Sequence, residues 1–394
     1  MRKNIIAGVS LVALSAGTAQ AAGLERSNVD ISFLFSDDAS ADIAIANVTP
    51  NFNPTNSNMF SFSASNVATS FSINTLDVKT EIFDNLVFGL WRTNSGNGVS
   101  IDYGVVSGAG ATGAFNPLDP TDVTNQSTIK ADVSIPSTML VAKYQLNDST
   151  SVIGGIKHVS VSGGELSLPA ELGANDPYGD DRVNGVGPID TTATWSLGSK
   201  QALGAVIGAA YEIDDIALRV SVLHETSIDL NVGATGVGVA AGSGATESSL
   251  GDATSIAFQT GIAEDTLLFG SIRYSNWEDN QIKLPNAAGV LTQVSAFDDG
   301  VNYTLGIGRK LSEKLSTSLS YYFSDGSGVG VSELAPFGDT KTLSIGARYA
   351  LSDSITLSGG YSHSERGDAT TGTFGAAFTG STVKTLGIKL TAQF

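Results

Sequence analysis

Cysteine is absent from the 394-residue sequence, which excludes disulfide bonds and thiolate metal sites. Proline is scarce at 10 residues and only 15% of residues are charged, whereas glycine is abundant at 45, a composition that suits many strands joined by loose loops. Basic residues are too few to balance the acidic ones, and the formal net charge of −18 argues against nucleic acid as a partner. No segment approaches the roughly 18 consecutive apolar residues that a membrane-spanning helix needs.

The first 21 residues have the features of a secretory signal peptide. Arg2 and Lys3 form a basic start, residues 5–14 form a short apolar run, and residues 19–21 (Ala-Gln-Ala) form a cleavage site of small residues. We therefore expect the chain to leave the cytoplasm and the mature protein to begin near Ala22. Since only helices and closed barrels satisfy their backbone hydrogen bonds in lipid, a membrane-inserted form of this chain has to be a barrel.

Residues 22–42 lack a sustained two-residue period and precede the first convincing strand. We predict that they form a short N-terminal hatch, or plug, and that residues 43–394 form the barrel. The apolar residues of the predicted hatch are Ile31, Phe33, Leu34 and Phe35, and its charged residues are Glu25, Arg26, Asp30, Asp37 and Asp38.

Residues 341–361 show the unit from which most of the chain is built. Apolar residues occupy the odd positions from Leu343 to Tyr349, a two-residue period that indicates a strand with one apolar face. The pattern breaks at residues 352–353 and resumes at Ile355. The segment is therefore predicted to be an antiparallel hairpin.

Short and long connections alternate along the rest of the chain. The short, acidic or serine-rich turns lie near 83–85, 147–149, 213–215, 263–265, 312–314 and 352–353. The longer loops, rich in Gly, Asn, Pro and Ala, lie near 50–58, 105–125, 166–190, 232–249, 281–296, 326–338 and 367–379. This alternation predicts an all-β fold of fourteen strands, the up-and-down plan of a transmembrane barrel with short periplasmic turns and long outer loops. An extra hairpin within 86–112 is an alternative that would change the count by two.

The chain ends on a strand whose last residue is aromatic. From Leu386 to Phe394 the apolar residues occupy the even positions, and bacterial outer-membrane barrels typically end in this way. We expect Phe394 to be the contact with the barrel assembly machinery. Aromatic residues near other strand ends, which we expect to form the two interfacial girdles, are Tyr144, Tyr211, Tyr274, Tyr321, Phe323, Tyr349 and Tyr361.

Several basic residues within the predicted strands fall on the polar phase. They are Lys143, Arg219, Arg273, Arg348 and Lys389. Each would cost roughly 2–4 kcal/mol if it faced the lipid midplane, so this sorting favours an interior filled by water or by a plug. A soluble β-sandwich would not need it.

Seven segments, spread over nearly the whole mature chain, are similar to one known family. They are residues 23–27 (GLERS), 67–71 (VATSF), 208–213 (GAAYEI), 216–220 (IALRV), 259–278 (QTGIAEDTLLFGSIRYSNWE), 303–313 (YTLGIGRKLSE) and 367–370 (GDAT). The sequence resembles the outer-membrane transporters of long-chain fatty acids and other hydrophobic compounds, the FadL/TodX type, in a divergent form that we associate with alphaproteobacteria. The resemblance implies a fourteen-stranded barrel with an N-terminal hatch in its lumen. The Asn-Pro-Ala motif of the better-known members' hatch is absent, so their residue-level account of ligand capture is not carried over.

Two motifs match catalytic or cofactor-binding patterns by their letters. Residues 236–241 fit a dinucleotide fingerprint, but they join two strands and open no helix, so an outer loop is the better interpretation. His158 and Ser160 have the spacing found in outer-membrane phospholipases of the A type, but the Ser-Asn-Gly continuation is missing. The other histidines, His224 and His363, have no metal-ligand spacing, and we expect no cofactor and no metal site.

These observations favour a passive channel in the bacterial outer membrane that takes up hydrophobic solutes such as long-chain fatty acids, without catalysis. Outer-membrane lipids and lipopolysaccharide are the expected surroundings. For an apolar capture site, the outer loops offer Phe115, Leu118, residues 166–172 and residues 374–378. Two alternatives remain open: a general porin for small polar solutes, and an outer-membrane lipid esterase that uses His158 and Ser160.

Six residues are expected along the solute path. They are Phe33, Leu34 and Phe35 of the hatch, and Arg219, Arg273 and Arg348 of the wall. The arginines either hold a solute carboxylate or pair with acidic hatch residues. The candidates for such pairing are Glu25, Asp30, Asp37 and Asp38. Pairing with the hatch is favoured, because an unpaired guanidinium in a partly dry lumen is costly.

Overall fold

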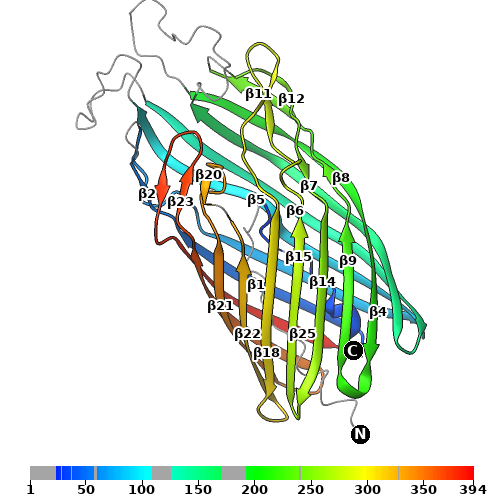
Figure 1. Cartoon of the computed structure of the whole chain (residues 1–394). Coiled ribbons are helices and arrows are strands. Elements are labelled where there is room, and N and C mark those ends of the chain that lie inside the picture. The colour runs from blue at the N-terminus through cyan, green and yellow to red at the C-terminus, as the bar shows by residue number, and fades with distance from the viewer. Residues whose placement is uncertain are drawn as a thin grey trace, which may run out of the picture.

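The chain folds into a closed antiparallel β-barrel (Figure 1). The computed structural model describes residues 24–27, 29–36, 38–56, 60–108, 126–169, 192–238, 241–326 and 328–394. Fourteen of the seventeen strands in the main sheet form the ring. They are β1 (Ser40–Asn51), β4 (Phe71–Phe83), β5 (Leu86–Gly108), β6 (Gln126–Asn147), β7 (Thr150–Pro169), β8 (Thr192–Ile213), β9 (Leu218–Glu225), β14 (Ala253–Ala263), β15 (Thr266–Ser275), β18 (Gly300–Lys310), β19 (Leu315–Ser324), β21 (Thr340–Ala350), β22 (Ile355–Arg366) and β25 (Thr382–Gln393).

The ring closes because β1 pairs on both of its edges. Its ladder with β25 runs from Ser40 opposite Gln393 to Asn51 opposite Thr382, and its other edge pairs with β4. The ring therefore has no free first or last strand, whose unpaired backbone groups would each cost several kcal/mol in lipid. Within the described residues, no helix is long and apolar enough to span a membrane.

The connections alternate as the sequence predicts. Each of the six short turns joins two neighbouring strands, and the longer connections lie at the opposite end of the barrel. β5 is one continuous strand over residues 86–108, so this range holds no extra hairpin and the count of fourteen is confirmed. β1 begins at Ser40, three residues before the expected start at Ile43. The predicted signal peptide, together with Phe115 and Leu118, lies outside the described residues.

The long connections contain short strands of their own, several of which lie at the end of the barrel drawn uppermost in Figure 1. β2, β20, β23 and β24 make a separate four-stranded sheet, whereas β10 pairs with β13 and β16 pairs with β17. β3, β11 and β12 extend the main sheet. These strands are β2 (Pro54–Thr55), β3 (Phe60–Phe62), β10 (Ile228–Asp229), β11 (Gly233–Val237), β12 (Gly244–Ala245), β13 (Ser249–Leu250), β16 (Lys283–Pro285), β17 (Leu291–Gln293), β20 (Val329–Val331), β23 (Ala369–Thr371) and β24 (Ala377–Phe378).

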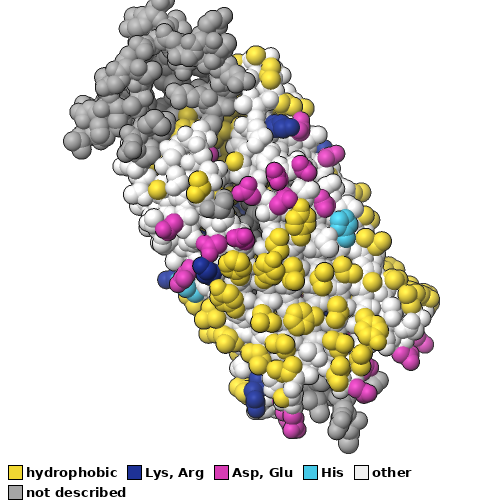
Figure 2. Space-filling model, viewed as in Figure 1, with side chains coloured by type: hydrophobic (Ala, Val, Ile, Leu, Met, Phe, Trp, Pro, Cys, Tyr) yellow, Lys and Arg dark blue, Asp and Glu magenta, His cyan; other side chains and the backbone are white. Residues whose placement is uncertain are grey.

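The outward face of the ring carries a belt of apolar side chains. Figure 2 shows this belt across the visible wall, with acidic side chains gathered above it. On β21, Leu343 and Ile345 are exposed on this face, whereas Ser344 on the alternate phase faces the lumen. The predicted girdle tyrosines 144, 211, 274, 321, 349 and 361 are also exposed, and Phe323 stacks on Tyr303. A closed ring with this belt is the architecture of a bacterial outer-membrane protein.

We expect Ile345→Arg to impair assembly, because Ile345 is 55% exposed within the apolar belt and an arginine there would cost about 2–4 kcal/mol at the lipid midplane. Ser344→Arg places the same charge one residue away on the lumenal face and serves as the control. The measurement is the fraction of protein that migrates faster on an SDS gel before boiling than after it. Equal folded fractions for both variants would contradict the assignment of the two faces.

Candidate solute path

The N-terminal segment, residues 24–39, lies against inward-facing side chains of the barrel. Its 3-10 helix η3 (Ser32–Phe35) places Leu34 fully out of solvent, in a cluster with Trp91, Met139 and Leu223. The other wall residues of this cluster come from β5 to β8 and are Val87, Val141, Ile153 and Val206. The predicted hatch residues Phe33 and Phe35 pack against the same cluster.

Gly89 of β5 provides the room in which η3 sits. A Cβ atom at this position would lie 2.4 Å from Leu34 Cδ2 and 2.6 Å from Phe33 Cε2. The glycine therefore lets the side chains of η3 approach the backbone of the wall.

Basic side chains of the wall contact the N-terminal segment at Phe35 and Ser36. The Phe35 ring lies 4.4 Å from the Arg219 guanidinium carbon and 4.6 Å from Lys143 Nζ, within cation–π range. Lys79 donates a hydrogen bond to the backbone oxygen of Ser36. Arg219 also donates to Gln259 Oε1 at 3.0 Å. Arg219 thus contacts the N-terminal segment through an aromatic ring, and the carboxylates of Glu212 and of Asp30 in the same segment act on it electrostatically.

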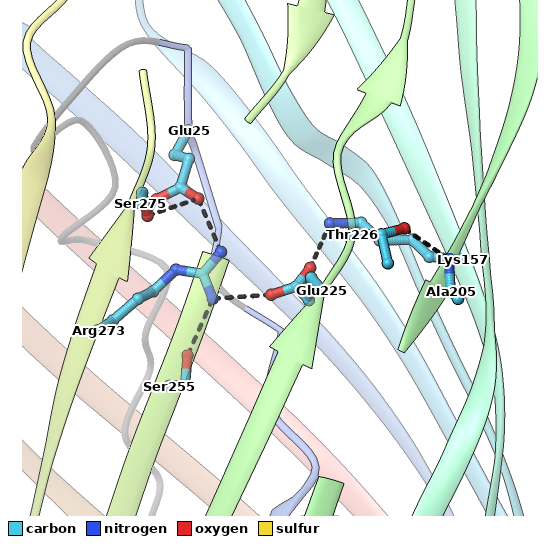
Figure 3. Close-up of polar contacts among 8 residues, drawn as sticks. All are labelled: Glu25, Lys157, Ala205, Glu225, Thr226, Ser255, Arg273 and Ser275. Atoms are coloured by element: carbon cyan, nitrogen blue, oxygen red, sulfur yellow. Dashed lines mark hydrogen bonds and ion pairs between the residues drawn. The ribbon is translucent and has the colours of Figure 1, made fainter. Parts of the chain in front are cut away.

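Arg273 is the centre of a buried ion network that joins the N-terminal segment to three strands (Figure 3). Its Nη2 donates to Glu25 Oε1 at 2.7 Å, and its Nη1 donates to Glu225 Oε1 at 2.7 Å. The second oxygen of Glu225 pairs with Lys157 Nζ at 2.6 Å. Ser275 Oγ lies 3.3 Å from both oxygens of Glu25. The pairing of Arg273 with the hatch residue Glu25, which the sequence favoured, is present in the structure.

Arg348 lies apart from this network. It occupies the inward face of β21, on the side of the lumen that also holds Asp42, and Asp42 pairs with Lys389 at 3.3 Å. The structure therefore distributes the three predicted arginines over three places instead of one site.

The pairing of β5 with both neighbours is interrupted at residues 94–96, which we call the β5 break. The ladder with β4 ends where Thr93 meets Thr75. The ladder with β6 skips from Thr93 opposite Ser137 to Asn97 opposite Ile135. Backbone groups in the wall of a barrel need other partners where the ladder stops.

The side chain of Asn94 supplies partners on the β4 side of the break. Its Oδ1 accepts from the backbone N–H of Asn74 at 2.7 Å, and its Nδ2 donates to the backbone oxygen of Ser72 at 3.2 Å. A side-chain bridge thus replaces backbone pairing at this point of the wall.

The N-terminal segment supplies partners on the lumenal side. The backbone N–H groups of Arg26 and Ser27 donate to Gly96 oxygen at 3.0 and 3.1 Å, and Gly98 donates to Leu24 oxygen at 2.8 Å. Gly98 has φ of 145°, a conformation that side chains disfavour. Residues 24–27 are therefore hydrogen-bonded to β5 at and beside its break.

Arg26 is buried beside this break, with its guanidinium carbon 4.4 Å from the centre of the Phe71 ring. Desolvation lowers the pKa of Arg26 to about 10, and the carboxylate of Asp132 acts in the opposite direction. The side chain is still protonated at neutral pH.

An apolar cluster fills the outer end of the barrel beneath the long connections, and we call it the outer apolar cluster. Leu24 of the N-terminal segment belongs to it, as does Trp277, which stacks edge-on against Phe297 at 5.8 Å. Other large members, from the wall and from the loops, are Phe52, Tyr103, Trp195, Phe337, Phe374 and Phe378. Part of the loop range expected to capture solutes, residues 374–378, is therefore buried in the cluster.

The two motifs outside this path do not form sites. His158 and Ser160 lie on the outward phase of β7, and within the described chain no hydrogen bond joins them to each other. Gly236 and Val237 end β11, and Ala241 forms an isolated bridge with Asn286, so the range 236–241 lies in an outer connection.

Several residues of the path were not identified from the sequence. Glu225 could have been identified from the sequence, because it shares the two-residue phase of Arg219 on β9 and therefore faces the lumen as well. Lys157 was missed because Gly154 and Gly155, just before it, have no side chains that show which face of β7 is apolar. Asn94 and Gly96 carried no signal, since a break in a ladder depends on neighbours that are distant in the sequence.

We expect Gly89→Val to push η3 away from the wall, because its side chain would overlap Leu34 and Phe33. Gly154→Val is the control, since a Cβ at Gly154 meets no atom within 4 Å. Single-channel conductance in planar bilayers should rise for Gly89→Val and stay at the wild-type level for Gly154→Val. Wild-type conductance in both variants would mean that η3 does not obstruct the lumen.

No family model matches the sequence, and no curated protein matches it. Solved structures with the same fold are nevertheless found. A FadL homologue from Pseudomonas aeruginosa has a TM-score of 0.70 at 12% identity, covering 96% of this chain and 98% of that one. The Pseudomonas putida toluene transporter TodX has a TM-score of 0.66 at 14% identity, covering 96% of both chains.

A third similar structure is the monoaromatic hydrocarbon channel CymD, with a TM-score of 0.61 at 13% identity, covering 99% of this chain and 98% of that one. These superpositions show a shared fold. At such low identities they do not show which solute the chain carries. The full-length superpositions, the ring of fourteen strands and its apolar belt agree with one another. The chain therefore has the FadL-type fold and is a barrel of the bacterial outer membrane.

Proposed function

We propose that the protein is a passive outer-membrane channel for the uptake of hydrophobic solutes such as long-chain fatty acids. The observation that carries the proposal is the outer apolar cluster, which extends from the long connections into the barrel and meets the N-terminal segment at Leu24. Two proteins of the same fold are named a toluene transporter and a monoaromatic hydrocarbon channel, which supports a hydrophobic solute.

Such a solute needs an apolar route because of its cost in water. At about 0.8 kcal/mol per methylene, a sixteen-carbon tail gains on the order of 12 kcal/mol on leaving water. The outer apolar cluster offers that environment, and no catalysis, cofactor or energy coupling is needed for transfer down a gradient.

The β5 break is the exit that we propose. At residues 94–96 the wall is held by the Asn94 side chain on the β4 side and by the N-terminal segment on the lumenal side. These few hydrogen bonds can break while the continuous ladders on either side of the β5 break stay intact. A solute that leaves here enters the lipid sideways and avoids the aqueous periplasm.

The alternative of a general porin is less consistent with the lumen. Residues 24–36 cross it, from the ion network at Glu25 to the buried Leu34, and a porin for polar solutes needs an open aqueous path. The esterase alternative loses support because His158 and Ser160 are not hydrogen-bonded to each other.

Deletion of residues 24–36 should raise ion conductance and the passage of small polar solutes, because it removes the obstruction. The same deletion should weaken retention of a long-chain fatty acid by the purified barrel. Conductance and fatty-acid uptake are measured in reconstituted bilayers. If both stay at the wild-type level, the segment is not a hatch.

A disulfide across the β5 break tests the exit. Because the native sequence has no cysteine, no other disulfide can form in the variant. Asn74→Cys with Asn94→Cys places two thiols on the adjoining edges of β4 and β5. The oxidised form should lose uptake of a hydrophobic solute, and reduction should restore it. The control is Ser344→Cys with Ser362→Cys, which face each other in the continuous ladder of β21 and β22. Uptake that survives oxidation of the first pair would exclude this exit.

A further inference from the structure

The outward face of three neighbouring strands becomes polar at one row of residues. Arg92 of β5 lies opposite Thr138 of β6, and Thr138 lies opposite His158 of β7. We call these three residues the Arg92 row. Neighbouring strands lie about 4.8 Å apart, so Arg92 and His158 are roughly 10 Å apart along the row. Because the arginine side chain is long, one small group can contact both ends of the row.

The apolar belt ends at this row. On the outward phase of each strand, the next residue toward the short turns is apolar: Leu90 on β5, Leu140 on β6 and Ile156 on β7. Leu140 is 53% exposed and Ile156 is 49% exposed. Toward the long connections, the next outward residues on β5 and β7 are the polar Asn94 and Ser160. The Arg92 row therefore lies where the belt meets the outer part of the barrel, at the level of the headgroups of the outer leaflet.

The guanidinium of Arg92 faces this boundary uncompensated. The side chain is exposed, and within the described ranges of the chain it makes no hydrogen bond and no ion pair. The nearest outward carboxylate on these strands, that of Asp132, lies six residues beyond Thr138, roughly 20 Å along β6. An arginine on the lipid face is costly, and the cost rises toward the midplane. An anion bound beside Arg92 would remove this cost.

The other two side chains of the row add hydrogen-bond donors. The Thr138 hydroxyl can donate, and His158 has a ring N–H in either tautomer. In the part of the chain that the structure describes, neither side chain has a hydrogen-bond partner. A phosphate group offers three strongly accepting oxygens and nearly two negative charges, whereas the two oxygens of a carboxylate are satisfied by a single guanidinium. The row therefore matches a phosphate better than a carboxylate.

We propose that the Arg92 row binds a phosphate group of lipopolysaccharide in the outer leaflet, with acyl chains of the same lipid lying on the belt at Leu140 and Ile156. Such a lipid combines the two chemistries that meet at the row, phosphate and hydrocarbon. The formal net charge of −18 repels anionic lipid in general, so attraction at this row determines where on the wall the lipid binds. The site lies on the outer surface of the barrel and is independent of the solute that crosses it.

The first test measures the lipopolysaccharide that stays bound when the full-length protein is extracted from outer membranes in a mild non-ionic detergent. Arg92→Gln should retain severalfold less of it than the wild type, and Arg92→Lys, which keeps the charge, should retain more than Arg92→Gln. Arg309→Gln is the matched control, because Arg309 is also exposed on the outward phase but lies at the short-turn end of β18, opposite Thr317. Equal retention by the wild type and Arg92→Gln would overturn the inference.

The second test separates the phosphate from the acyl chains. The probes are phosphorylated lipid A and the same lipid after removal of its phosphates, and their affinities for the purified barrel are measured in detergent. The phosphorylated probe should bind about tenfold more weakly to Arg92→Gln and also more weakly to His158→Leu, because each variant loses a donor. The dephosphorylated probe should bind the wild type and both variants alike. Wild-type affinity for the phosphorylated probe in either variant would exclude the row as its site.

A carboxylated solute is the other candidate for this row, and palmitate is measured with the same variants to distinguish it. If Arg92→Gln weakens binding of phosphorylated lipid A, the inference is supported whatever palmitate does. If Arg92→Gln weakens binding of palmitate alone, the row serves the solute and the inference is overturned. Neither outcome depends on uptake of hydrophobic solutes, which tests the proposed channel function separately.

Discussion

Closure of the ring between β1 and β25 is the constraint on which the rest of the structure depends. Lipid offers no hydrogen bonds to the backbone, so the first and last strands of the barrel have to pair along their length, and they do so from Ser40 to Asn51. This pairing places Ser40 beside the C-terminal end of β25, at the end of the barrel that carries the short turns. The N-terminal segment therefore ends at the short-turn end with Ala39, and its earlier residues lie in the interior, where Glu25 contacts Arg273 and residues 24–27 contact β5.

The N-terminal segment lies inside the closed barrel, and this determines how the charged side chains that face the lumen are paired. Lumenal arginines and lysines avoid the lipid, but several of them, such as Lys79, Arg273 and Arg366, are buried within the barrel. The structure compensates them locally. Arg273 lies between two glutamates, Lys389 pairs with Asp42, and Lys143 and Arg219 lie against the Phe35 ring. Each of these contacts also holds part of the N-terminal segment or of the wall, so charge compensation also fixes the segment against the wall.

A shared fold does not fix the solute, because the side chains inside the barrel differ between proteins of this fold. Proteins of this fold at 13% and 14% identity are named for monoaromatic hydrocarbon and for toluene. In this chain the boundary is marked by a buried ion network with equal numbers of positive and negative groups. Removal of any one of these four groups would leave a buried charge uncompensated, so the network is stable only as a unit.

The sequence by itself determined the barrel and the orientation of its faces, because a two-residue period and alternating turns are local properties of the chain. It predicted fourteen strands, but the alternative of an extra hairpin within 86–112 was removed only by the continuous β5 of the structure. It also indicated an N-terminal hatch and the favoured pairing of Arg273 with a hatch carboxylate, since sign and phase of charge can be read from single strands. Only the tertiary structure decided that Glu225, Lys157 and Ser275 complete that site and that β5 is interrupted beside Gly96. The physical reason is that both features depend on register between segments far apart in sequence, from Glu25 to Arg273, which appears only when the ring closes around the segment.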